Sequence, residues 1–559
     1  MITKNVLKAE TILIPKSVKD MFIIAILMFI SFSSFSQEFT RADTLRGSIT
    51  PERAWWNILH YDLNVTPNAS EKSIEGSNTI TYEVLKPKNI MQIDLQSPMK
   101  IDKVLQDGKP LQYTSDGNAH FINIQKTQVV GEENTITIYF SGKPREAIRP
   151  PWDGGFTWAK DSNGKDFIAN SNQGIGASVW WPLKDHPSEE PDNGVTISVT
   201  TPKDLMDVSN GRLKEVIENA DSKTWVWEVE NTINSYSVNL SIGDYVHFGH
   251  KYQGENGILD MDYYVLRENE AKAREQFKQA PMMMEAFEYW FGPYPFYEDS
   301  YKLVETPYLG MEHQSSVTYG NNFANGYLGK DVSGSGWGMK FDFIIIHESG
   351  HEWFANNITN KDVADMWIHE GFTSYSENLY LDYHFGKKAS SEYVIGVRNN
   401  VVNEKPIIIG DYNVNKSGSG DMYYKGANVL HTLRQLIADD EKWRQVLRGL
   451  NKEFYHQNVT TKQIEGYIND KSGIDLAEFW DQYLRTIMIP KVEYSIEGNT
   501  MKFRYVDIVK NFEMPIIAIV NGEEVWIHPT SEWKTKQFQS PVKSFEIKKD
   551  FYVNSQMMK

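Results

Sequence analysis

The chain has 559 residues, 40% of them hydrophobic and 13% aromatic, a composition that excludes a disordered chain and suggests about three packed domains. Its formal net charge of −17 opposes binding to nucleic acid or to anionic membranes, because both require clustered positive charge. No cysteine is present, which excludes disulfides, thiolate metal ligands and cysteine nucleophiles.

A short apolar run with a basic flank lies near the N-terminus. Lys16 and Lys19 precede the apolar residues 21–30, and the serine-rich residues 31–36 follow. We therefore predict that residues 1–36 form a secretory signal peptide, so that the protein is periplasmic or extracellular and has no stable membrane span after cleavage. A retained membrane anchor is the alternative.

Residues 50–250 alternate apolar and polar side chains in short runs separated by turn-forming residues. Residues 79–84, 135–140 and 195–199 are examples. A period of two residues is typical of half-buried strands. We predict an N-terminal antiparallel β domain over residues 50–250.

Residues 251–489 change to helical patterns. Residues 271–291 predict one long helix, and Pro490 ends the helical region. Residues 490–559 return to short strand-like runs, which predict a small C-terminal β-sandwich. The predicted fold is therefore multidomain, with β-rich regions on both sides of a mainly helical one.

The most informative motif is H-E-x-x-H at residues 347–351. His347 and His351 are four residues apart, so both imidazoles lie on one helix face and can bind one metal ion, with Glu348 directed at a water there. Glu370 follows nineteen residues after His351 and can complete a His₂Glu set with an open fourth position. We predict one Zn²⁺ per chain. The alternative is an ordinary buried helix, which would bury these polar groups without a partner.

Three further motifs accompany H-E-x-x-H. They are Gly310-Met311-Glu312, W-x-x-E-G-F at residues 367–372 and Y-x-K-G at residues 423–426. Together the four motifs resemble the gluzincin zinc aminopeptidase family, the membrane alanyl aminopeptidase-like family of aminopeptidase N and leukotriene hydrolase, from about residue 50 to 490. The resemblance implies a thermolysin-like zinc metallopeptidase domain over residues 251–489.

The resemblance also implies roles for single residues. His347, His351 and Glu370 match the zinc ligands of the family, and Glu348 matches its general base. Tyr423 matches the tyrosine that stabilises the oxyanion of the tetrahedral intermediate; this choice over Tyr424 rests on the Y-x-K-G register alone.

Four other positions match substrate-binding residues of the family. Glu312 matches the glutamate that binds the free α-amine of the substrate, and Gln173 resembles the second ligand of that amine. Gly310 and Met311 belong to a segment that the family uses as an edge strand against the substrate backbone. Glu377, two helical turns after Glu370, is a candidate to orient a ligand histidine, although a solvated surface glutamate fits the same pattern.

Two residues depart from the G-x-M-E-N pattern of the family. Leu309 replaces its first glycine and His313 replaces its asparagine, and both put the substrate preference in doubt. We expect His313 to titrate near the substrate amine between about pH 6 and 8, where a histidine of ordinary pKa gains charge.

These features predict a zinc-dependent aminopeptidase that hydrolyses the N-terminal peptide bond of peptides with a free N-terminus, by a metal-activated water. One alternative is a zinc endopeptidase that shares only the metal helix. Another is a catalytically silent binding protein on the same fold. The sequence does not indicate an oligomeric state.

Overall fold

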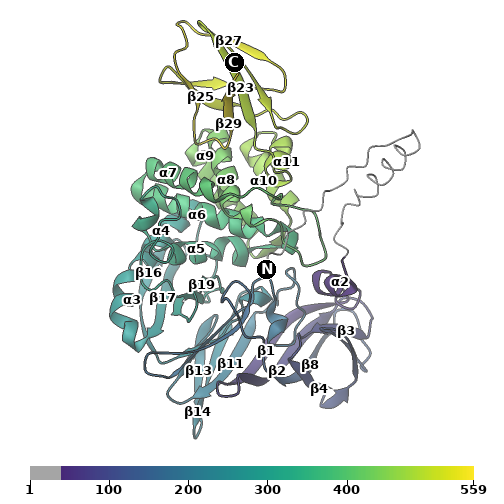
Figure 1. The fold of residues 1–559 in the computed structure, drawn as a ribbon. Helices are drawn as coiled ribbons and strands as arrows, with labels where there is room; N and C mark the ends of the chain where they lie inside the picture. The colour runs from purple at the N-terminus through teal and green to yellow at the C-terminus, as the bar shows by residue number, and fades with distance from the viewer. Residues whose placement is uncertain (1–38, 559) are drawn as a thin grey trace, which may run out of the picture. The chain divides into compact units, whose positions relative to one another are not determined.

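The computed structural model describes residues 39–558, and the predicted signal peptide at residues 1–36 lies outside this range. Among the described residues, no helix combines the length and the apolar character needed to cross a membrane. The first described helix is α2 (Arg41–Gly47), which precedes the first sheet (Figure 1).

An eight-stranded sheet dominates the N-terminal region, in the order β13-β14-β11-β1-β2-β8-β4-β5 (Figure 1). Apolar residues on alternate positions of its strands are buried, as the period of two predicts. Every neighbouring pair is antiparallel except β1 with β11, which is parallel. The strands are β1 (Trp56–Asn68), β2 (Ser73–Val84), β4 (Lys100–Gln106), β5 (Lys109–Leu111), β8 (Glu133–Gly142), β11 (Val195–Pro202), β13 (Arg212–Glu218) and β14 (Ser222–Val229).

Two smaller sheets complete this region. One has the order β3-β7-β6 and the other the order β12-β15-β10-β9. Their strands are β3 (Ile90–Asp94), β6 (Tyr113–Asp116), β7 (Ala119–Asn123), β9 (Gly155–Lys160), β10 (Asp166–Ser171), β12 (Met206–Val208) and β15 (Ser241–Gly243).

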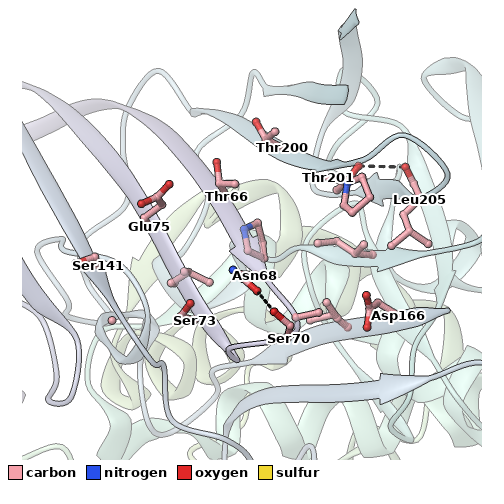
Figure 2. A pocket seen from close by; sticks show the side chains of 17 residues that line it. Thr66, Asn68, Ser70, Ser73, Glu75, Ser141, Asp166, Thr200, Thr201 and Leu205 are labelled. Carbon is pink, nitrogen blue, oxygen red and sulfur yellow. Dashed lines mark hydrogen bonds between the residues drawn. The ribbon is translucent and has the colours of Figure 1, made fainter. Parts of the chain in front are cut away.

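A cavity of about 550 Å³ is lined by residues of the eight-stranded and the β12-β15-β10-β9 sheets (Figure 2). Its polar groups bond to one another: Ser70 Oγ donates to Asn68 Oδ1 at 2.8 Å, and Thr201 Oγ1 donates to the Leu205 carbonyl at 3.1 Å. None of the predicted site residues lines this cavity.

A five-stranded sheet, ordered β16-β17-β18-β20-β19, leads into the helical region. The predicted domain boundary between residues 250 and 251 falls inside the strand β16 (Tyr245–Gly254). This strand pairs without interruption with β17 (Gly257–Leu266), so the chain does not divide there. The other strands are β18 (Tyr301–Glu305), β19 (Gly310–Met311) and β20 (Val317–Tyr319).

The helix predicted over residues 271–291 is two helices, α3 (Glu270–Gln276) and α4 (Gln279–Phe291). Pro281 explains the break. A proline has no N–H to donate to the carbonyl of residue 277, and its ring clashes with that carbonyl in a continuous helix. The break places Pro281 within the first turn of α4, where no intrahelical N–H bond is required.

Seven more α-helices follow in the described chain (Figure 1). Their buried apolar side chains belong to one large apolar core. They are α5 (Phe343–Gly350), α6 (Trp367–Phe385), α7 (Lys387–Val397), α8 (Tyr424–Ile437), α9 (Asp440–Glu453), α10 (Thr461–Ser472) and α11 (Ala477–Leu484). A short parallel pair, β21 (Ile358–Asn360) with β22 (Gln457–Val459), joins two connections between them.

The C-terminal region forms two sheets, ordered β27-β24-β23-β29 and β26-β25-β28. Buried residues of both sheets, such as Phe503 and Ile516, belong to the same large apolar cluster as the helical region, and the predicted C-terminal β-rich region is confirmed. The strands are β23 (Lys491–Glu497), β24 (Thr500–Val506), β25 (Ile516–Val520), β26 (Glu523–Ile527), β27 (Lys534–Gln537), β28 (Phe545–Ile547) and β29 (Asn554–Met557).

Candidate active site

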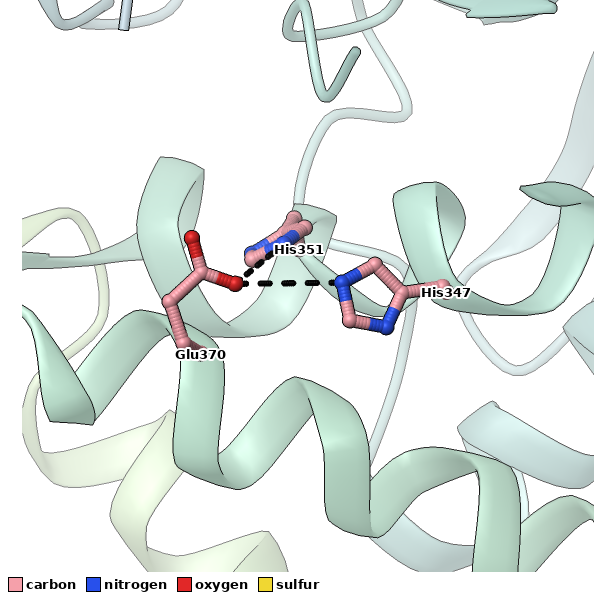
Figure 3. A group of neighbouring side chains, drawn as sticks. All are labelled: His347, His351 and Glu370. Atoms are coloured by element: carbon pink, nitrogen blue, oxygen red, sulfur yellow. Dashed lines mark ion pairs between the residues drawn. The ribbon is translucent and has the colours of Figure 1, made fainter. Parts of the chain in front are cut away.

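His347, His351 and Glu370 meet between α5 and α6 (Figure 3). Glu370 Oε2 lies 3.7 Å from His347 Nε2 and 3.4 Å from His351 Nε2. Asp342 caps the N-terminus of α5 by accepting hydrogen bonds from the N–H groups of Ile344 and Ile345. This cap fixes the residue at which the helix begins. The helical period then directs both imidazoles toward α6.

Glycines allow the helices that carry the site to approach closely. A Cβ on Gly350 in α5 would stand 2.5 Å from Ser376 Oγ of α6. A Cβ on Gly426 in α8 would stand 2.8 Å from the Cα of Gly371 in α6. Any side chain at these positions would push the helices apart, so the glycines of both motifs serve packing.

Side chains behind the two histidines fix their orientation. His347 Nδ1 donates to Glu377 Oε1 at 2.7 Å, and the Tyr393 hydroxyl donates to Glu377 Oε2 at 2.5 Å. His351 Nδ1 lies 3.1 Å from the Phe354 carbonyl and 3.0 Å from Thr373 Oγ1. Each Nδ1 is occupied, so each Nε2 faces Glu370.

The donor set fits a zinc ion. Glu370 Oε2 is buried, and no hydrogen-bond donor reaches it within the described chain. Burial would raise the pKa of Glu370, but the adjacent His351 and His347 hold it well below its usual range. Burying a carboxylate oxygen and two imidazole nitrogens against one another is energetically unfavourable without a cation between them. Two histidines and one glutamate are a known ligand set of catalytic zinc.

Glu348 lies next to this group and lines a cavity of about 540 Å³. Burial raises its pKa to about 7, against the opposing effect of His347 and with a contribution from Glu312. A carboxylate with a raised pKa, directed into a cleft beside a candidate metal site, can both accept and release a proton near neutral pH.

Glu312 lines the same cavity, is 2% exposed and has two polar partners. Its Oε1 accepts from Gln173 Nε2 at 2.7 Å and from the Tyr236 hydroxyl at 2.9 Å. Gln173 Nε2 also donates to Glu370 Oε1 at 2.9 Å, which links the amine-binding candidates to the metal-binding group. Tyr236 is not among the residues predicted from sequence, because no motif surrounds it and only folding brings it to Glu312.

Tyr423 and Tyr424 both line the cavity. Tyr423 immediately precedes α8, and its ring stacks on His347 with centroids 6.1 Å apart. Burial raises its pKa well above the usual value, and the negative charge of Glu370 adds to the effect. The hydroxyl therefore stays protonated and can donate.

Gly310 and Met311 line the same cavity from β19, so the structure brings every predicted site residue except Glu377 to its wall, and Glu377 lies behind His347. The remaining wall is largely apolar or aromatic. It includes Trp152, Leu309, Tyr327, Val332, Phe343, Ile344 and Val402. Neither lysine nor arginine lines it.

His313 does not titrate as expected. It is fully buried, with 0% exposure, and burial lowers its pKa to about 3. Its side chain faces Thr318, with Nδ1 3.4 Å from Oγ1, and does not line the cavity. The expectation of a charge change between about pH 6 and 8 is wrong, because sequence does not reveal that this position points into the core.

Two domain models of one peptidase family match the sequence of this chain. The Peptidase M1 N-terminal domain matches residues 57–237, and the Peptidase family M1 domain matches residues 275–483. The chain belongs to peptidase family M1. This confirms the resemblance to aminopeptidase N-like proteins that the four motifs indicated.

The relatives compared with this chain are distant in sequence. "Probable aminopeptidase 2" of Sulfurisphaera tokodaii is 21% identical over 476 residues, which cover 81% of this chain and 58% of the relative. "Leucyl aminopeptidase" of Saccharolobus solfataricus is 22% identical, and the match covers 80% of this chain and 57% of that relative. The chain thus spans little more than half the length of these relatives.

A solved structure confirms the family M1 fold. The M1 zinc metallopeptidase from Deinococcus radiodurans superposes with a TM-score of 0.65 at 21% identity, and the match covers 79% of this chain and 95% of that one. The predicted β-rich, helical and β-rich order is therefore correct.

Proposed function

We propose that this M1 family chain is a zinc aminopeptidase that removes the N-terminal residue of peptides. The observation that carries the proposal is the buried Glu312 carboxylate, which opens into the same cavity as Glu348 and the His₂Glu group. A carboxylate at this place pairs with the free ammonium of a peptide, whereas an internal peptide segment would leave it desolvated without a partner. This favours an exopeptidase over the endopeptidase. The presence of His347, His351, Glu370 and Glu348 at one cavity opposes the silent binding protein.

His347, His351 and Glu370 would hold the zinc ion. When bound, zinc supplies a Lewis acid that activates water and polarises the carbonyl of the bond to be cleaved. Glu377 supports this set through His347 Nδ1. Such a partner fixes the imidazole tautomer and raises the basicity of the ligand.

The other residues act on the substrate and on protons. Glu312, with Gln173 and Tyr236 beside it, binds the α-ammonium and sets which bond is presented. Glu348 accepts a proton from the attacking water and passes it to the leaving amine. The Tyr423 hydroxyl donates to the carbonyl oxygen as negative charge develops there, which lowers the barrier.

A panel of aminoacyl chromogenic amides, assayed with and without a chelator, tests this function. We expect hydrolysis that a chelator abolishes and added zinc restores, together with one zinc per chain by metal analysis. A protein that cleaves no aminoacyl amide but cuts blocked peptides internally would be an endopeptidase. Full zinc occupancy without hydrolysis of either kind would favour the silent binding protein.

We also propose that the chain is exported. The basic flank, the apolar residues 21–30 and the serine-rich residues 31–36 support this. Fractionation of producing cells with N-terminal sequencing of the product tests it: we expect the protein outside the cytoplasm, beginning near residue 37. A product that keeps residues 1–36 in the membrane fraction would support the anchor instead.

A further inference from the structure

The strand β19 lies at the edge of its sheet and has one open side. It pairs with β20 alone, with Gly310 opposite Tyr319 and Met311 opposite Thr318. The Leu309 carbonyl accepts from the Gly320 N–H at 2.7 Å, so it faces β20. Because successive backbone groups of a strand alternate in direction, the backbone of Gly310 faces the other side, toward the cavity.

This open side sets the direction of a bound peptide. Glu312 directly follows β19, so a peptide whose ammonium lies at Glu312 and which pairs with β19 must run antiparallel to it, toward Leu309. A Cβ on Gly310 would stand 3.2 Å from Glu348 Cγ, which places the first residue of β19 beside the proposed general base. The first peptide bond of the substrate then lies near Glu348.

The third residue of such a peptide reaches the level of Leu309, because a strand advances roughly 3.3 Å per residue. Leu309 and Trp152 each line two cavities: the catalytic one and a second cavity of about 490 Å³. Apolar and aromatic side chains form much of the second cavity. They include Pro150, Phe167, Tyr308, Tyr319, Phe323 and Leu328.

Trp152 is 64% exposed, although the loop that carries it is tightly held. Asp153 accepts from the N–H groups of Ile148 at 2.9 Å and Arg149 at 2.7 Å. The Pro151 carbonyl accepts from the Gly154 N–H at 3.0 Å and from Ser171 Oγ at 3.2 Å. An exposed indole on an ordered loop at the entrance of a cleft can bind an apolar group of a ligand without a rearrangement of the loop.

We propose that Trp152 and Leu309 form a platform for the third residue of the peptide substrate, and that an apolar or aromatic side chain there is favoured. The platform rests on the proposed function, because the direction of the peptide depends on the binding of its amine at Glu312. The enzyme thereby prefers peptides of at least three residues over dipeptides and simple amides.

Three substrates with the same first residue test the platform: leucine amide, Leu-Ala-Gly and Leu-Ala-Phe. We expect wild type to favour Leu-Ala-Phe over Leu-Ala-Gly by about tenfold in kcat/KM, the range of one buried aromatic contact. Trp152→Ala should erase this preference and affect leucine amide far less than Leu-Ala-Phe, whereas Trp152→Phe should keep most of the preference. Ile148→Ala is the matched control, because Ile148 is 81% exposed on the same loop and lines neither cavity.

A preference that survives Trp152→Ala would overturn the proposal, and so would an equal loss on all three substrates or no preference in wild type. Calorimetric binding of both tripeptides to zinc-loaded Glu348→Gln, with and without Trp152→Ala, separates the platform from catalysis. A further outcome is that wild type hydrolyses none of the substrates while the two tripeptides still bind with different affinities that depend on Trp152. In that case the proposed function fails and the platform stands.

Discussion

Glu377 Oε1 accepts a hydrogen bond from His347 Nδ1 at 2.7 Å, between two side chains that are both almost fully buried. The hydroxyl of Tyr393 holds the other oxygen of the same carboxylate. The His347 nitrogen that faces Glu370 is therefore oriented by a residue thirty positions away, which itself has a fixed partner.

Replacing Glu377 by glutamine should weaken zinc binding by about 10- to 100-fold, because the histidine loses a charged partner that raises its basicity. Competition with a chromophoric chelator measures this affinity. Tyr393→Phe, which leaves the carboxylate in place, should have a smaller effect. An unchanged affinity in Glu377→Gln would show that this contact serves only the packing of α5 against α6.

Glu348→Gln should keep zinc and folding but lower turnover by about 10²- to 10⁴-fold, the usual contribution of a general base. Zinc content and kcat on an aminoacyl amide are the two measurements. His250→Ala, at an exposed position on β16, is a control that should change neither. Loss of zinc from Glu348→Gln would indicate that Glu348 supports the metal instead.

Tyr423→Phe should lower kcat by about a hundredfold and change KM little, because a donor to the developing oxyanion acts mainly in the transition state. Tyr424→Phe is the matched control, since Tyr424 is the next residue and lines the same cavity. A larger defect in Tyr424→Phe would assign the role to that residue.

Acetylation of the substrate amine should lower kcat/KM at least about thirtyfold, because a charge-assisted hydrogen bond to Glu312 is lost and a buried carboxylate stays unpaired. Glu312→Ala should remove most of this discrimination by slowing only the free-amine peptide. Matched free and acetylated peptides provide the comparison. Equal cleavage of both by wild type would contradict the aminopeptidase proposal.

His313 should make the fold sensitive to acid. Burial lowers its pKa to about 3, so below the ordinary value of about 6.5 the unfolded chain binds a proton that the folded one rejects. The expected loss of stability between pH 7 and pH 5 is about 2 kcal/mol, and none arises above pH 7. Denaturation of His313→Asn at both pH values should show a smaller loss; an equal loss would mean that His313 accepts a proton in the folded protein.

The sequence by itself determined the features that depend on local geometry. The spacing of His347 and His351 works because any α-helix places residues four apart on one face. Alternation with a period of two marked the strands of the eight-stranded sheet, because successive side chains of a strand point to opposite faces. The matched motifs and their order were enough to indicate the family, whose fold the structure then confirmed.

Tertiary structure alone decided which distant groups meet. Tyr236 contacts Glu312 across 76 positions and Gln173 does so across 139, and no periodic pattern encodes such separations. Burial of His313 reversed its expected protonation, because the cost of charging a group depends on its neighbours in space. The approach of Trp152 to the cleft likewise follows from the loop that carries it, since packing between remote segments is set only when the whole chain has folded.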